Sequence, residues 1–405
     1  MKKIESDDKA ATSFIELLQI ALGNRTLLSS PCSDRQWEEI YHMARKQAMT
    51  GIIFYAATQL PADMAPPTRL KSMWTLNALQ IEDTNKKQFK ECKTATEFFA
   101  NNGLLSCILK GQSNLFFYPP YLRMLRMPGD IDIWTFKKED TSKRIFPKKD
   151  IILLVWDKTG EKSEVNLHHI DCRLFPKTPV EVHFVPSFAV NPFTDRKYIR
   201  WFHNHKSDII STKAGYNILD INFNIIFQMM HIYRHLLLEG IGFRQLIDLY
   251  FTLVSRKKRL ETTQDQKYDK SIIFQELCNL GMKRITEAVM WILHSILAMD
   301  EKHLICKPSE KYGREMLDEI MRGGNFGQHY KSPNTAETAA EPYISPDDMT
   351  RDGRSMIRDK MKRFHEFYDA CRHGFRLIAS YPEEVLWIPY LYIKAFFVRN
   401  YWRKQ

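Results

Sequence analysis

The sequence predicts an α+β protein, in which a small mixed β-sheet is flanked by helices and the C-terminal half is largely helical. Residues 68–100 contain neither glycine nor proline, which predicts one long helix. From Asp220 onward, apolar residues again recur at helical spacing. Between these regions lie short apolar or alternating segments bounded by turn residues, which is typical of strands. We therefore expect a helical segment at 1–103, the sheet at 104–190 and a helical domain at 191–405.

The composition is that of a globular protein that interacts with anions. The chain has 405 residues, of which 44% are hydrophobic and 26% charged, and its net charge of +11 favours nucleotides, nucleic acid, phosphorylated sugars or an anionic surface. Its seven cysteines form no CxxC pair, which predicts reduced thiols and a cytoplasmic protein. No signal peptide follows Met1, and no apolar run approaches the roughly 20 residues of a membrane helix, so we expect no transmembrane segment.

A pair of aspartates marks the candidate site. Gly129–Trp134 alternates carboxylate and apolar residues, so in a strand Asp130 and Asp132 share one face and the isoleucines share the other. Two neighbouring carboxylates repel each other unless a positive charge lies between them. Mg²⁺ is usually held by one or two carboxylates together with phosphate oxygens, so this pair indicates a metal–phosphate site.

A glycine turn upstream would complete such a site. The apolar run Leu104–Leu109 predicts a buried strand that ends at Gly111, where the absence of Cβ lets a phosphate approach closely. Residues 112–114 then form a turn into a short helix, Leu115–Tyr118, whose N-terminal N–H groups favour anions.

A third carboxylate is expected on a later strand. Val180–Val185 alternates so that Glu181 and His183 share a face, and Glu181 is our candidate for the third metal ligand, with Asp171 as the alternative. The segments 164–172 and 180–185 are predicted to pair antiparallel. Asp150–Trp156 is apolar, and periodicity alone does not decide between helix and strand.

Together these motifs resemble a known family. An LKG turn at Leu109–Gly111, an arginine at Arg126, the GDIDIW strand at Gly129–Trp134 and the later Glu181-x-His183 pair resemble the nucleotidyltransferase core of the DNA polymerase beta superfamily. More narrowly, they resemble a bacterial family of uncharacterised nucleotidyltransferases, over about residues 35–255. The superfamily usually has Ser directly after the turn glycine, where this chain has Gln112.

The resemblance implies a Mg²⁺-dependent transfer of a nucleoside monophosphate from an NTP to a hydroxyl group, with release of pyrophosphate. It implies that Asp130, Asp132 and Glu181 hold a two-metal site, occupied by Mg²⁺ or by Mn²⁺. The nucleotide-binding residues it implies are Lys110, Gly111, Gln112, Ser113, Arg126 and Arg244. The acceptor stays open among a small molecule, a sugar, RNA and a protein. The alternative is a non-catalytic nucleotide- or RNA-binding protein on the same fold.

Four further features carry weaker signals. His231 and His235 lie four apart on a predicted helix, and we expect them to line a cleft rather than bind a metal. Arg244 either pairs with Asp248, four residues later, or contacts the nucleotide. Residues 322–350 predict a lid or a linker. We expect the aromatic C-terminal helix to pack as the last core helix, rather than on a membrane surface.

Overall fold

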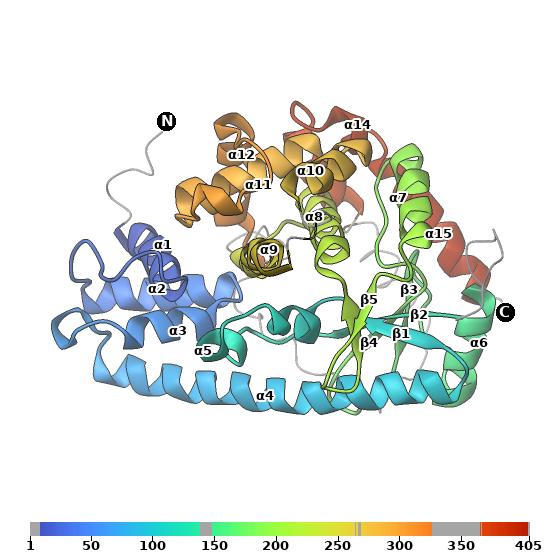
Figure 1. Ribbon diagram of the computed structural model, residues 1–405, viewed down its shortest axis with the longest axis horizontal. Coiled ribbons are helices and arrows are strands. Elements are labelled where there is room, and N and C mark those ends of the chain that lie inside the picture. The colour runs from blue at the N-terminus through green and yellow to red at the C-terminus, as the bar shows by residue number, and fades with distance from the viewer. Residues whose placement is uncertain are drawn as a thin grey trace.

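The computed structural model describes residues 9–137, 148–263, 265, 269–325, 365 and 367–403. Within them, many helices surround a six-stranded mixed sheet, which confirms the predicted α+β class (Figure 1). The expectations for residues 1–8 and for residues 326–350 of the predicted lid or linker lie outside the described residues.

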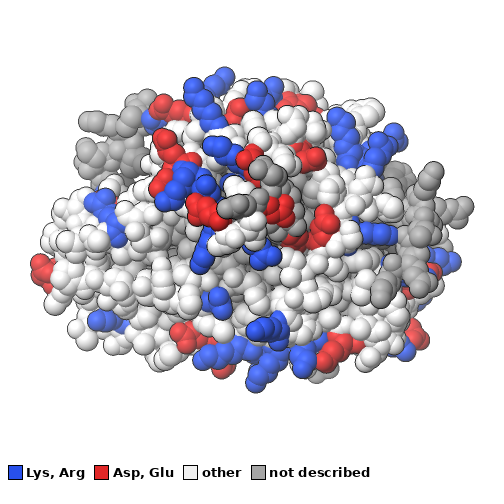
Figure 2. Space-filling view, in the orientation of Figure 1, with Lys and Arg blue, Asp and Glu red and all other residues white. Residues whose placement is uncertain are grey.

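The N-terminal part of the chain is helical, and its helices pack together with the long predicted helix. Ser33 caps its helix with a capping box, because its side chain accepts from the Gln36 backbone and the Gln36 side chain accepts in return. The longest helix has 34 residues and runs along the lower edge in Figure 1, where Lys and Arg side chains are frequent (Figure 2). These elements are α1 (Lys9–Ala21), α2 (Asp34–Lys46), α3 (Thr50–Thr58), η1 (Ala62–Met64) and α4 (Thr68–Asn101).

The sheet has the strand order β3-β4-β2-β1-β6-β5. Its strands are β1 (Leu105–Ile108), β2 (Ile131–Phe136), β3 (His169–Cys172), β4 (Val180–His183), β5 (Ile209–Ser211) and β6 (Asn217–Leu219). Strand β2 pairs antiparallel with β1 and parallel with β4, and β3 pairs antiparallel with β4 as predicted. The hairpin β5–β6 adds to the β1 edge, so the sheet extends beyond the expected range of 104–190.

The remaining helices cover both faces of the sheet. Asp150–Trp156, which the sequence left undecided, lies within a helix that packs on one face of the sheet, close to β3. The elements are η2 (Gly111–Phe116), α5 (Pro120–Arg123), α6 (Lys148–Thr159), α7 (Pro192–Asn204), α8 (Ile221–Leu238), α9 (Phe243–Thr263), α10 (Lys270–Asn279), α11 (Lys283–Trp291), η4 (Ile292–Ile296), η5 (Glu301–His303), α12 (Glu310–Gly323), α14 (Pro382–Val385) and α15 (Ile388–Arg403), and residues 367–377 are also helical.

Two hydrophobic clusters follow from the alternation of the strands. The isoleucine face of β2, with Ile131 and Ile133, packs on α6 and the C-terminal half of α4. The opposite face carries Asp132 and Trp134, and Trp134 contacts Phe223 at the start of α8. The second cluster joins the N-terminal helices to those that follow the sheet, so the carboxylates point toward the helical half of the protein.

The C-terminal helix α15 is only partly a core helix. It buries Ile388, Leu391 and Trp402, as expected of a last core helix, but several large apolar side chains on its other side are exposed. Among the described helices, none is both long enough and apolar enough to span a bilayer.

Candidate active site

Two parallel neighbours, β2 and β4, bring the predicted carboxylates together. Their register pairs Asp132 with Glu181, and both side chains lie on the face opposite the isoleucines. The Asp132 side chain is fully buried, whereas Asp130, just before the strand, is one-third exposed. Asp171 lies one strand farther out on β3, with its side chain 54% exposed. The register therefore favours Glu181 over Asp171 as the third carboxylate.

Lys110, at the end of β1, lies between the two aspartates. Its Nζ is 3.1 Å from Oδ1 of Asp132 and 3.7 Å from Oδ2 of Asp130. Burial acts to lower the pKa of Lys110, but the charges of Asp130 and Asp132 outweigh it and raise this pKa. Within the described residues, Oδ2 of Asp132 has no hydrogen-bond partner. A buried carboxylate oxygen without a partner is costly, and a bound cation would satisfy it.

Two histidines contact Glu181, His183 from the same strand and His169 from the edge strand β3. Nε2 of His183 is 2.9 Å from Oδ1 of Asp132 and 3.3 Å from Oε2 of Glu181. Burial would lower the pKa of His183, but these hydrogen bonds raise it to about 9, so the ring is protonated at neutral pH. Burial would raise the pKa of Glu181, but its hydrogen bond with His183 lowers this pKa to about 2. His169 approaches the same Glu181 oxygen at 3.4 Å, and burial lowers the pKa of this histidine to about 4.

A chain of polar contacts continues from this cluster to α8. Arg234 donates to Nε2 of His168 at 2.8 Å and to Nε2 of His235 at 3.0 Å, and His235 bonds Glu239. Six of the described residues form groups of three His, Asp or Glu side chains that could hold a metal: Asp132, His168, His169, Asp171, Glu181 and His183. His231 and His235 belong to none of them, and His231 lines the pocket, as the sequence predicted.

The glycine turn forms, but its side chains do not all face the site. The short helix η2 begins at Gly111, where φ is +63°, rather than at Leu115 as expected. Gln112 is buried and donates to the side chains of Asn85 and Gln88 on α4, at 3.2 and 2.5 Å, so it points away from the pocket. The Ser113 hydroxyl is buried, with no hydrogen-bond partner in the described part of the chain.

Arg126 pairs with Asp248, the residue that the sequence spacing had suggested as a partner of Arg244. It donates two hydrogen bonds to Asp248 on α9, at 2.7 and 2.6 Å, and both residues are at most 5% exposed. Tyr118 and Asn114 also donate to Asp248, at 2.7 and 3.0 Å. The expected pair of Arg244 with Asp248 is therefore replaced by the pair of Arg126 with Asp248. Burial, with the charge of Arg126, lowers the pKa of Arg244 to about 10, so Arg244 stays positive at neutral pH.

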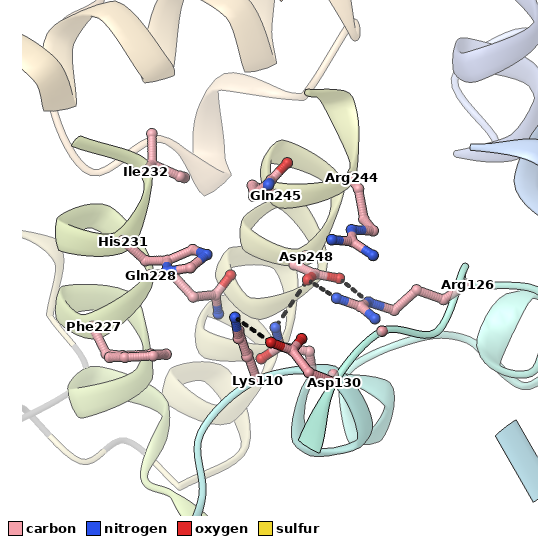
Figure 3. Close-up of a pocket in the computed structure, with 13 residues that line it drawn as sticks. Lys110, Arg126, Asp130, Phe227, Gln228, His231, Ile232, Arg244, Gln245 and Asp248 are labelled. Atoms are coloured by element: carbon pink, nitrogen blue, oxygen red, sulfur yellow. Dashed lines mark hydrogen bonds and ion pairs between the residues drawn. The ribbon is translucent and has the colours of Figure 1, made fainter. Parts of the chain in front are cut away.

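A pocket of about 480 Å³, its mouth included, opens beside these groups between η2, α8 and α9 (Figure 3). Lys110 and Asp130 lie on one side of it, and His231, Gln228 and Arg244 project from the two helices on the other side. Lys110, Gly111, Arg126, Asp130 and Arg244 all line the pocket. Gln112 and Ser113 do not, and Asp132 and Glu181 lie behind Asp130 and Lys110 rather than in the pocket lining.

A comparison with family models matches residues 33–298 to a family described as uncharacterised nucleotidyltransferase. The chain belongs to this nucleotidyltransferase family. It is thus an enzyme of the class that transfers phosphorus-containing groups, as the sequence motifs predicted. Searches of curated proteins and of solved structures found no match.

The match covers the whole sheet and the helices α8 and α9, so the candidate site lies within the nucleotidyltransferase region. The sequence identified the carboxylates but missed the contacts of His169 and His183 with Glu181. The alternation of His169 with Asp171, and of Glu181 with His183, was the available signal. Only the register of β3 on β4 shows that these residues meet.

Proposed function

We propose that this nucleotidyltransferase transfers a nucleoside monophosphate from an NTP to a hydroxyl-bearing acceptor, and that the reaction depends on Mg²⁺. The observation that carries the proposal is the convergence of Asp130, Asp132 and Glu181 with Lys110 at one end of the sheet, beside the pocket. Three carboxylates this close repel one another unless cations lie between them. Lys110 and the protonated His183 supply part of this positive charge, and a bound divalent cation would supply more.

The donor set fits a hard divalent cation. Asp130, Asp132 and Glu181 supply oxygen ligands, and Oδ2 of Asp132, which has no hydrogen-bond partner in the part of the chain that the structure describes, is a donor that a cation would use. Mn²⁺ fits the same oxygen set. When bound, the metal would neutralise charge on the triphosphate and on the oxygens that react. The histidine contacts keep Glu181 ionised and oriented, which is the state that a ligand needs.

The chain's own groups supply the rest of the mechanism. Lys110 and Arg244 place positive charge on opposite sides of the pocket, where it would stabilise the charge that develops on the leaving pyrophosphate. Gly111, without a Cβ, leaves room for a phosphate at the end of β1. The guanidinium of Arg126 donates its hydrogen bonds to Asp248 rather than to a ligand. It would therefore act on the nucleotide through its positive electrostatic potential and by fixing the loop before Asp130.

The test is the transfer of label from an NTP labelled at the α-phosphate, offered separately with RNA, protein and sugar acceptors. The expected result is α-label in one acceptor pool together with free pyrophosphate, and loss of both in Asp132→Asn. Asp150→Asn is the matched control, because Asp150 is exposed and, within the described residues, its ion pair is with Lys137 on the surface. In a parallel reaction with an NTP labelled at the γ-phosphate, transfer of label to an acceptor would contradict the proposal. Nucleotide binding with no transfer to any pool would favour the non-catalytic alternative.

A further inference from the structure

The C-terminal helix presents a continuous apolar stripe to solvent. Its members in the helix recur every three or four residues and are between 44% and 66% exposed: Tyr390, Ile393, Phe397 and Tyr401. Leu386, which is 65% exposed, precedes them in the turn before the helix. This spacing places them on one side of the helix, opposite the buried Ile388 and Leu391. Scattered single apolar residues are normal on a protein surface, but an aligned set of this size marks an interaction site.

Helix α7 extends this surface beside α15. The ring of Phe193, which is 61% exposed, lies 5.7 Å from the ring of Trp387, and Lys394 is 3.6 Å from Asp195. The two helices run next to each other on the right of Figure 1. The apolar stripe therefore continues onto a second helix rather than ending at α15.

The charges on these two helices are almost all positive. The exposed ones are Arg196, Lys197, Arg200, Lys394 and Arg403. Helix α15 has no acidic residue, and the one acidic residue of α7, Asp195, is buried beside Lys394. Such a surface is complementary to a partner that is apolar inside and negative at its rim.

We propose that α7 and α15 dock the protein on an anionic phospholipid surface. Aromatic and aliphatic side chains enter the boundary between headgroups and acyl chains, and flanking Lys and Arg contact the lipid phosphates. Helix α15 is not apolar enough to cross a bilayer, so it would lie along the surface. This inference revises the expectation that the C-terminal helix packs as the last core helix rather than on a membrane surface.

Two other occupants fit the surface less well. A second copy of the chain, paired through the same stripe, would bring the cations of α7 and α15 near their own counterparts, and like charges oppose such a contact. Single-stranded nucleic acid would match the positive charge, but it stacks on rings, and Leu386 and Ile393 offer none. A lipid surface uses both the aliphatic side chains and the cations.

The test is co-sedimentation of the full chain with vesicles of phosphatidylcholine, with and without phosphatidylglycerol, at about 0.05 M and 0.5 M salt. We expect binding to the anionic vesicles that weakens at high salt. The double variant Ile393→Asp/Phe397→Asp should bind at least about tenfold more weakly. The matched control is Leu76→Asp, because Leu76 is 68% exposed on the distant helix α4, and it should bind like wild type.

Light scattering and melting temperature complete the experiment. The variants change exposed residues, so each should melt within a few degrees of wild type, which shows that lost binding is not lost folding. If the wild-type protein does not co-sediment with anionic vesicles at low salt, the proposal is wrong. A dimer that the double variant dissociates would overturn it too, since the stripe would then be covered by a second copy. Equal binding by the double variant and Leu76→Asp would also overturn it.

Discussion

Replacing Asp248 with asparagine tests how the pocket is held together. Asp248 accepts two hydrogen bonds from Arg126 and one each from Tyr118 and Asn114, and it is 4% exposed. The variant keeps the shape of the side chain but removes its charge. The guanidinium of Arg126, which is 5% exposed, would then lie buried without a counter-charge, and one of its N–H groups would face an amide nitrogen.

The size of the effect follows from this burial. Removing one partner of a buried ion pair costs roughly 3–5 kcal/mol, because the other charge stays in a poorly solvated place. A loss of that size is a large part of the stability of a typical domain, which is about 5–15 kcal/mol. Asp150→Asn, in the exposed pair with Lys137, should cost less than about 1 kcal/mol.

Urea unfolding of wild type, Asp248→Asn and Asp150→Asn measures these differences. The double variant Arg126→Gln/Asp248→Asn should recover part of the loss, because it removes the buried unpaired charge. If Asp248→Asn is no more destabilising than Asp150→Asn, Arg126 does not form a stabilising buried ion pair with Asp248. The assignment of Arg126 to the pocket wall is then wrong.

Two other predictions concern the scaffold. Gly51→Ala should destabilise the protein by about 1–3 kcal/mol in urea unfolding, because the added Cβ would overlap the backbone carbonyl of Leu125; no loss would show that the loop before Asp130 adjusts freely. Burial raises the pKa of Glu384 from 4.5 to about 7, so the folded state favours the protonated form of this side chain. The contribution of Glu384 to the free energy of unfolding therefore falls as the pH rises between those two values, by up to roughly 1.4 kcal/mol per pH unit. The difference in unfolding free energy between wild type and Glu384→Gln should shrink over this window, and a constant difference would contradict the assignment.

The elements that the sequence predicted are those with a strong local signal. Residues 68–100 form one helix because no glycine or proline interrupts them, and Gly103, with φ of +75°, follows its end. The alternation of Gly129–Trp134 fixed which residues share a face of β2. The strands β5 and β6 were missed because each has three residues, which is too short for a period-two pattern to show.

The partners of the site residues could not be predicted because they come from distant parts of the chain. Spacing suggested Arg244 for Asp248, whereas Arg126 reaches it from 122 residues away. Gln112 follows the turn glycine directly, yet its side chain donates hydrogen bonds to the amides of Asn85 and Gln88 on α4 and so points away from the pocket. Local patterns carry no information on such contacts, since register and helix packing decide them.

The central claim is that the nucleotide binds at the Asp132 carboxylate with a divalent metal. The most direct measurement is the melting temperature with Mg²⁺ and each of ATP, GTP, CTP and UTP, for wild type, Asp132→Asn and Asp150→Asn. A ligand bound only by the folded state adds about 2.7 kcal/mol at a hundredfold excess over Kd. The account predicts a Mg²⁺-dependent rise with at least one nucleotide, kept in Asp150→Asn and lost in Asp132→Asn. No rise with any nucleotide, or a rise that Asp132→Asn keeps, would contradict it.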